Sequence, residues 1–221
     1  MGLLDAQAHY LDHLVEVVRS EGVDAVLVSG DVYDRALPSP ETVGLLSDAV
    51  TRLIDAGAAV VLSSGNHDSA IRLGFASELL SRAGLHIRTS LASVGLPVLI
   101  GDAAIYPLPY LEPSVAADRI GAGEHTHASV LRAAMDRVRI DAGTRNSPSV
   151  VMAHAFVTGG ATSDSERDIS VGGVSAVPPD VFVSADYVAL GHLHGPQGVS
   201  ETVRYSGSPI ALSFSEANHH K

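Results

Sequence analysis

The chain of 221 residues contains no cysteine. Disulfide bonds and thiolate chemistry are therefore excluded, and any bound metal must be held by oxygen and imidazole ligands. The first residues, MGLLDAQAHYLDH, carry neither the basic segment nor the apolar run of a signal peptide, and no hydrophobic stretch approaches the length of a membrane span. We therefore expect a cytoplasmic protein that makes no contact with a membrane.

Charged residues are also scarce at 18%, whereas hydrophobic residues reach 46%. This composition excludes a disordered or coiled-coil chain and predicts one domain, or one domain with part of a second. The formal net charge of −11 argues only weakly against a nucleic-acid-binding protein. The argument is weak because carboxylates that gather at a metal site are offset by the bound cations.

Helix-like and strand-like segments alternate along the chain. Apolar residues at helical spacing predict helices at 3–21, 40–56, 70–83 and 124–141. Short apolar runs bounded by turn residues predict buried strands at 24–31, 58–68, 149–156 and 186–195, and the stretch 94–111 is rich in strand signals. This alternation predicts an α/β fold in which the later strands form a second sheet packed against the first.

Metal-capable side chains follow four of the predicted strands. They are Asp31 after the first, Asn66, His67 and Asp68 after the second, His154 after the third, and His192 and His194 after the fourth. In α/β sheets, ligands bind outside the carboxyl ends of the strands, so we expect these four strand ends to converge on one site. A carboxylate, an amide oxygen and several imidazoles suit Mn, Fe or Zn better than calcium, which prefers oxygen alone.

Each of these residues also has a simpler interpretation. Taken alone, Asp31, Asn66 and Asp68 fit turn or helix-cap positions, and His154 fits a hydrogen-bonded structural histidine. The metal site is favoured because all four strand ends carry such residues in one chain. The other histidines lack this context and are expected at the surface or in packing: His9, His13, His86, His125, His127, His219 and His220.

The order of the motifs resembles that of the calcineurin-like metallophosphoesterases. It runs GD-x-x-D (30–34), GNHD (65–68), a single strand-end histidine (154) and GH-x-H (191–194). Longer segments, among them HAFVTGGATSDSERDISVGG and RYSGSPIALSFSEANHHK, narrow the resemblance to the SbcD-type nuclease subunits of the bacterial SbcCD complex. The resemblance covers nearly the whole chain and implies a two-sheet β-sandwich flanked by helices, formed by residues 1–221.

The resemblance also implies a role for each motif residue. Asp31 would bridge two divalent metals, expected to be Mn²⁺. Asn66, His154 and His192 would complete the first metal site, and His194 would bind the second metal. His67 would be the catalytic histidine beside the scissile phosphate, and Asp68 would orient or polarise it.

The activity implied is hydrolysis of DNA phosphodiester bonds, as a 3′–5′ exonuclease on double strands and an endonuclease on single strands. The implied partners are DNA, an SbcC-type SMC-like ATPase subunit and a second copy of the chain. However, no D-x-H precedes GD-x-x-D here, although the family pattern begins with a strand that ends in this motif. We therefore expect a nuclease domain truncated at its N-terminus, without its first strand, and without the C-terminal DNA-binding cap.

This departure leaves only Asp31 and His194 for the second metal, which predicts weak binding there and low activity. Two alternatives stay open. One is a different phosphoesterase of the same superfamily that acts on phosphoproteins or nucleotides. The other is a non-catalytic remnant that binds only a partner or a metal.

Overall fold

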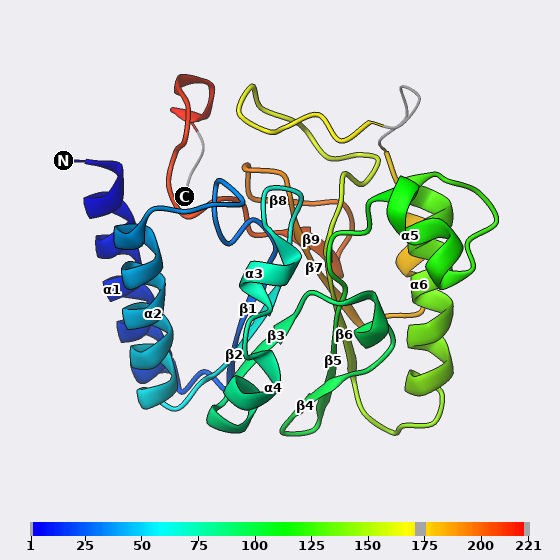
Figure 1. Cartoon of the computed structure of the whole chain (residues 1–221), viewed down its shortest axis with the longest axis horizontal. Coiled ribbons are helices and arrows are strands. Elements are labelled where there is room, and N and C mark those ends of the chain that lie inside the picture. The colour runs from blue at the N-terminus through cyan, green and yellow to red at the C-terminus, as the bar shows by residue number, and fades with distance from the viewer. Residues whose placement is uncertain (1, 171–175, 219–221) are drawn as a thin grey trace.

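Two β-sheets packed face to face form the centre of the protein (Figure 1). The computed structural model describes residues 2–170 and 176–218. The first sheet is parallel, in the order β1 (Ala25–Ser29), β2 (Ala59–Ser63) and β3 (Leu85–Arg88). The second sheet has the order β4 (Val98–Ile100), β5 (Ala103–Pro107), β6 (Ser149–His154), β7 (Tyr187–Gly191), β9 (Val203–Tyr205) and β8 (Gln197–Gly198). This arrangement confirms the predicted α/β fold with two sheets.

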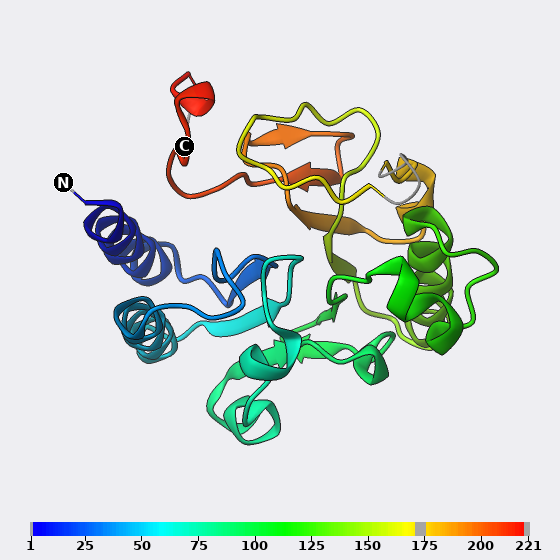
Figure 2. The ribbon, with the colours of Figure 1, turned by 45° about the horizontal axis from the view of Figure 1, so that its top comes forward.

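Helices cover the outer face of each sheet, as the turned view in Figure 2 shows. On the first sheet lie α1 (Leu3–Glu21) and α2 (Pro40–Asp55), and on the second lie α5 (Pro113–Ile120) and α6 (His127–Ala142). The helix ends follow from local chemistry. The Ser39 side chain caps α2 by accepting a hydrogen bond from the Thr42 backbone, with Pro40 in the first turn. α1 ends where Gly22 adopts a left-handed conformation.

Three apolar clusters hold these layers together. Val61, Val98, Ile105 and Met152 are buried between the two sheets. A second cluster joins α1 and α2 to the first sheet, and a third, larger cluster joins α5 and α6 to the second sheet. Because both faces of each sheet are covered, β2 and β6 are almost continuous runs of buried residues.

The prediction of one helix over 70–83 is wrong. The segment instead forms α3 (Ala70–Leu73), α4 (Ser77–Leu80) and the 3-10 helix η1 (Ser81–Ala83). The break falls at Gly74 and at Ala76, whose positive φ of 57° cannot belong to a right-handed helix. Helix α5 is not predicted by the sequence pattern. Its first residue is Pro113, and proline both interrupts strands and begins helices, so its presence after a stretch rich in strand signals does not indicate a helix.

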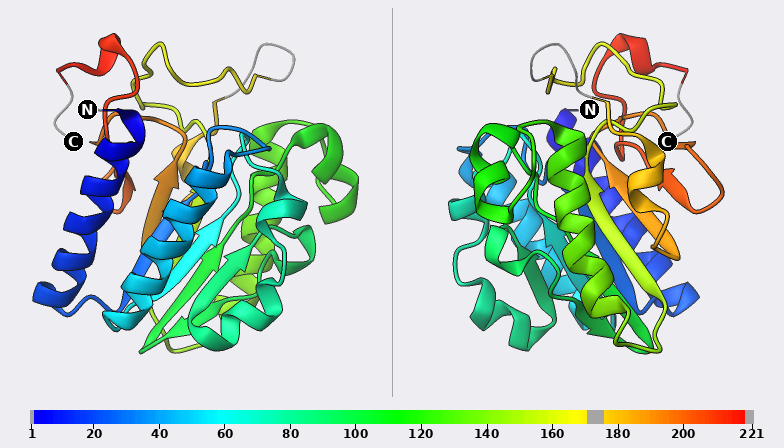
Figure 3. Two further views of the ribbon diagram at one scale, coloured as in Figure 1. Left: turned by 60° about the vertical axis from the view of Figure 1, so that its left-hand side comes forward. Right: turned by 90° about the vertical axis from the view of Figure 1, so that its right-hand side faces the viewer.

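Two segments from the second half of the chain lie beyond the carboxyl ends of the strands (Figures 1 and 3). One is the loop that follows β6, and the other is the stretch after β9, which contains the 3-10 helix η4 (Phe214–Glu216). Two further 3-10 helices, η2 (Leu91–Ser93) and η3 (Pro179–Phe182), serve as connectors. Among residues 2–170 and 176–218, no helix combines the length and apolarity needed to cross a membrane.

Candidate metal centre

The carboxyl ends of β1, β2, β6 and β7 meet at one edge of the sandwich. In the first sheet, Ser29 at the end of β1 pairs with Ser63 at the end of β2. In the second sheet, His154 at the end of β6 pairs with Gly191 at the end of β7. The two pairs are joined because the Ser29 hydroxyl donates to the carbonyl of Ala189, on β7, at 2.9 Å. The predicted convergence of the four strand ends is therefore present.

His154 lies at the centre of this edge and is almost fully buried. Its Nδ1 donates to the Ser29 carbonyl at 2.9 Å, so the neutral ring carries its proton on Nδ1 and a lone pair on Nε2. That Nε2 lies 2.9 Å from Asn66 Oδ1 and 3.3 Å from Asp31 Oδ2. Three electron-pair donors thus face one another, an arrangement that is repulsive unless a proton or a metal cation lies among them.

The backbone is strained where it presents two of these residues. Asp31 has a φ of 49° and His192 a φ of 101°, values that cost energy for any residue with a Cβ. The turn before Asp31 also requires glycine, because Gly30 has a φ of 85° and an added Cβ would lie 2.4 Å from His154 Nδ1. Such strain concentrates at functional sites, where surrounding contacts hold the backbone in place.

His67 faces the same carboxylate from the second strand end. Its backbone N–H donates to Asp31 Oδ1 at 3.0 Å, and its ring Nε2 lies 3.6 Å from Asp31 Oδ2. The other ring nitrogen, Nδ1, lies 3.0 Å from the carbonyl of Asp34, which can only accept, so Nδ1–H donates this hydrogen bond. Arg167, from the loop after β6, donates to the same Asp34 carbonyl at 3.0 Å. His67 is therefore oriented with Nε2 toward the centre.

Asp68 does not orient His67, contrary to the prediction. Its carboxylate accepts hydrogen bonds from the backbone N–H groups of Val32 at 3.1 Å, Tyr33 at 3.0 Å and Gly65 at 2.9 Å. Burial raises the pKa of Asp68, although these three amides act in the opposite direction. The carboxylate thus ties the turn that carries Asp31 to the turn that carries His67, and its effect on the site is through the backbone.

His192 and His194 follow β7 in different surroundings. The His192 ring lies edge-on to His154, with 5.3 Å between ring centroids, and its burial lowers its pKa to about 4. It is therefore neutral near pH 7, as a metal ligand must be. His194 has its Nδ1 2.8 Å from the carboxylate of Glu216 and 2.9 Å from the Ser165 hydroxyl.

The donor set matches a small divalent cation in chemistry and spacing. Burial would raise the pKa of Asp31, but its contacts with His154 and His67 lower it overall and keep the carboxylate ionised. Two neighbouring ligands that are each about 2.1 Å from a metal lie about 3.0 Å apart at an octahedral metal and about 3.4 Å apart at a tetrahedral one, and the separations of His154 Nε2 from its oxygen partners, 2.9 Å and 3.3 Å, are close to this range. Within residues 2–170 and 176–218, no group of three or more His, Cys, Asp or Glu side chains is arranged to hold a metal, so the ligand spacing is met by Asp31, Asn66 and His154, while the His192 ring lies next to His154.

The family model for calcineurin-like phosphoesterases matches residues 4–196. The chain belongs to this family. Its members are metal-dependent hydrolases of phosphoesters and hold divalent metals, so family membership agrees with the donor set described above. The chain is also similar in fold to TT1561 of Thermus thermophilus, whose crystal structure superposes with a TM-score of 0.53. The sequence identity is 12%, over 91% of this chain and 84% of that chain, and the likeness therefore concerns the fold alone.

The lowered pKa of His192 predicts that acid destabilises the metal-free phosphoesterase. In the unfolded chain this ring protonates near pH 6.5, whereas in the folded chain it stays neutral down to about pH 4. The unfolded state therefore binds more protons in this window, and stability present above pH 6.5 is lost as the pH falls to about 4. The full loss from this residue is roughly 3 kcal/mol.

Urea denaturation in EDTA at a series of pH values measures this effect. The variant His192→Asn should flatten the slope between pH 6.5 and 4, and asparagine tolerates the positive φ at this position. The control His13→Asn changes an exposed histidine on α1 and should leave the slope intact. An unchanged slope in His192→Asn would contradict the assignment of a buried, neutral ring.

Some residues around the centre were not predicted from the sequence. Tyr110 stacks edge-on against His154 at 6.2 Å between ring centroids, and burial, with the charge of Glu112, raises its pKa, so that it stays a neutral hydroxyl. A cavity of about 250 Å³ beside Asn66 is lined by Tyr110, Glu112, Asp168, Ile169 and Ser170. Tyr110 follows β5 closely, so the strand-end rule that identified the other residues would have found it too.

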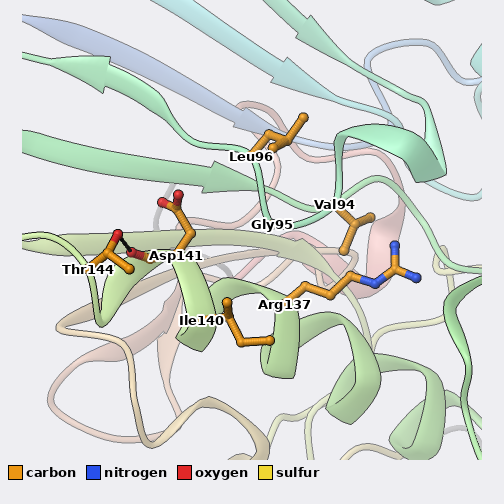
Figure 4. A pocket seen from close by; sticks show the side chains of 7 residues that line it. All are labelled: Val94, Gly95, Leu96, Arg137, Ile140, Asp141 and Thr144. Atoms are coloured by element: carbon orange, nitrogen blue, oxygen red, sulfur yellow. Dashed lines mark hydrogen bonds between the residues drawn. The ribbon is translucent and has the colours of Figure 1, made fainter.

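A second cavity, of about 390 Å³, lies between α6 and the turn after η2 (Figure 4). It is lined by Val94, Gly95, Leu96, Arg137, Ile140, Asp141 and Thr144, and it includes none of the strand-end residues.

Among the other histidines, His127 has a packing role as expected, because it is buried and its Nε2 lies 2.7 Å from the Ile169 carbonyl. His219 and His220 lie outside the described residues.

Proposed function

We propose that this phosphoesterase hydrolyses DNA phosphodiester bonds, as the nuclease subunit of an ATPase–nuclease complex for DNA repair, with Mn²⁺ as its metal. The observation that carries the proposal is the convergence of Asp31 Oδ2 and Asn66 Oδ1 on His154 Nε2, at 3.3 Å and 2.9 Å. The choice of DNA rests on the segments that resemble SbcD-type nucleases, which extend through the loop after β6 and the segment after β9.

The residues divide into metal ligands and groups that act on the substrate. Asp31, Asn66, His154 and His192 would hold one cation, and Asp31 with His194 the second. Bound divalent cations supply an activated water and offset the charge on the phosphate. His67 in its protonated form would present Nε2–H to the leaving oxygen, since its Nδ1–H is held by the Asp34 carbonyl and the Asp31 carboxylate lies 3.6 Å away.

Arg167 is suited to hold the substrate next to His67. Its guanidinium uses one N–H on the Asp34 carbonyl, and the remaining N–H donors of this side chain have the fork geometry that matches a phosphate. Its position places a fixed positive charge beside the catalytic histidine of a chain whose net charge is −11. We propose that it contacts the phosphate that flanks the scissile bond.

The proposed partners are DNA, an SbcC-type ATPase subunit and a second copy of the chain. An exposed apolar surface follows directly after the GNHD turn, where Ile71 is 90% exposed, Phe75 80% and Leu79 65%. Large apolar side chains that are clustered and exposed mark interaction surfaces.

Calorimetric titration with Mn²⁺ tests the proposed ligand sets. We expect one tight site, supported by four side chains, and a second, much weaker site, since within residues 2–170 and 176–218 only Asp31 and His194 are assigned to it. Two tight and equivalent sites would contradict this assignment.

The substrate is tested with the same Mn²⁺-loaded protein on end-labelled duplex DNA, on single-stranded DNA and on p-nitrophenyl phosphate. Slow cleavage of DNA that depends on Mn²⁺ supports the nuclease assignment. Hydrolysis of the small phosphoester without DNA cleavage would instead favour a phosphoesterase of other specificity. Metal binding with no hydrolysis of any substrate would favour a non-catalytic protein.

A further inference from the structure

Glu216 is a fully buried carboxylate in the segment after β9. Its side chain has no exposed surface, although Phe214, two residues earlier in the same 3-10 helix, is completely exposed. Glu216 lies twenty residues beyond Pro196, where the match to the phosphoesterase family ends. Family membership therefore assigns it no role. Burying a carboxylate is costly unless hydrogen bonds or an ion pair compensate the lost hydration.

The partners of Glu216 include the ring of His194. Oε1 accepts from His194 Nδ1 at 2.8 Å and from the Ser165 hydroxyl, and Oε2 accepts from the backbone N–H of Leu212 at 3.2 Å. These bonds favour the ionised carboxylate, which can only accept. Nδ1 of His194 must therefore carry the proton, and Nε2 is the ring atom that has the lone pair for a metal.

The backbone of His194 is held by the same two segments. Glu166, from the loop after β6, accepts from the His194 N–H at 2.8 Å, and the N–H of Ser208 donates to the His194 carbonyl at 3.0 Å. Gly207 lies so close to this carbonyl that an added Cβ would be 2.6 Å from its oxygen. The ring orientation and the main chain of His194 are thus both set by residues far from it in the sequence.

We propose that Glu216 is a positioning residue for the second metal: it fixes His194 as the Nδ1–H tautomer and directs Nε2 toward the cation shared with Asp31. This inference rests on the proposed function in so far as His194 is a metal ligand. Carboxylates that hold the distal nitrogen of a ligating histidine contribute roughly 10- to 100-fold to metal affinity. The structural alternative is that Glu216 only anchors its own segment.

The tautomer of His194 is measured first, in the metal-free chain of 221 residues, by long-range ¹H–¹⁵N correlation of the imidazole nitrogens at a pH where the rings are neutral. We expect one Nδ1–H species in the unsubstituted protein. Glu216→Gln should convert it to a mixture, because the amide can donate to the ring as well as accept from it. An Nε2–H species in the unsubstituted protein, or an unchanged spectrum in Glu216→Gln, would overturn the proposal.

Occupancy of the second site is then followed as the weak phase of the calorimetric Mn²⁺ titration, after the tight site has been filled. Glu216→Gln should weaken this phase by roughly 10- to 100-fold, while the tight phase is unchanged. Ser215→Ala is the matched control, because it removes the hydrogen bond that the Ser215 hydroxyl accepts from the Asp164 N–H at 3.4 Å and so loosens the same 3-10 helix, while the carboxylate of Glu216 and its bond to His194 stay in place. It should shift only the melting temperature. An equal loss of Mn²⁺ affinity in Ser215→Ala would assign Glu216 a purely structural role.

Glu216→Asp keeps the carboxylate and covers the case in which Glu216→Gln does not fold. Glu216→Asp should leave a larger fraction of His194 in the Nδ1–H form than a neutral replacement that folds, such as Glu216→Gln. If the fraction were no larger, the result would count against the proposal. The tautomer is read without metal or DNA, and the tight Mn²⁺ site is read by calorimetry. Failure of this inference is therefore distinguishable from failure of the proposed function.

Discussion

Replacing Asp31 with asparagine should abolish tight Mn²⁺ binding and remove most of the phosphodiesterase activity. The carboxylate is the only anion among the donors that face His154 Nε2, and it is the residue shared by both proposed cations. The loss of Mn²⁺ affinity should exceed the roughly 10- to 100-fold typical of an outer-shell partner. Because metal assistance contributes several kcal/mol to phosphoryl transfer, the rate should fall by at least about 10²–10³-fold.

Asparagine is the informative replacement because it preserves the geometry. It tolerates the positive φ of 49° at this position, whereas alanine would add backbone strain to the loss of charge. Asp102→Asn is the matched control, since Asp102 is exposed in the turn between β4 and β5. Calorimetry with Mn²⁺ and thermal melting are measured on both variants. Tight Mn²⁺ binding in a folded Asp31→Asn protein would show that the cation is held elsewhere.

The meeting of the strand ends was predictable in two steps. Parallel strands of one sheet present their carboxyl ends at one edge, which groups Asp31 with the GNHD turn and His154 with His192. The two groups come together because the second sheet packs against the first, as the alternation of helices and strands predicted. Buried strands of five or six β-branched and small residues, bounded by turn residues, are recognisable in a single sequence. The same logic accounts for the two sheets and for α1, α2 and α6.

The partners within the site were not predictable, because they depend on which loop atoms meet. The resemblance implied that Asp68 orients the His67 ring, but the turn directs this carboxylate to the amides of Val32, Tyr33 and Gly65. Glu216 contacts His194 across segments that have neither helical nor strand periodicity. Sequence patterns record period and turn chemistry, and they do not record how two irregular segments pack against each other.

Replacing His67 with glutamine should lower the rate of DNA cleavage by about 10²–10⁴-fold, the usual contribution of a positioned acid, and should leave Mn²⁺ affinity unchanged. The ring contacts the site through Nε2, which lies 3.6 Å from Asp31 Oδ2, farther than His154 Nε2 at 3.3 Å from the same oxygen. Its Nδ1 is engaged with the Asp34 carbonyl, which fixes the ring without using the nitrogen that faces the substrate.

The separation between rate and affinity decides the role of His67. Glutamine keeps the backbone N–H that donates to Asp31 Oδ1 at 3.0 Å, so the metal ligand stays in place while the proton donor is removed. Single-turnover cleavage of end-labelled DNA at saturating Mn²⁺ measures the rate, and His13→Gln on α1 serves as the exposed control. A substrate with a better leaving group should recover part of the lost rate, because it needs less protonation. If His67→Gln instead weakens Mn²⁺ binding in proportion to the rate, the residue is a metal ligand and the acid must be sought among the other groups at this edge.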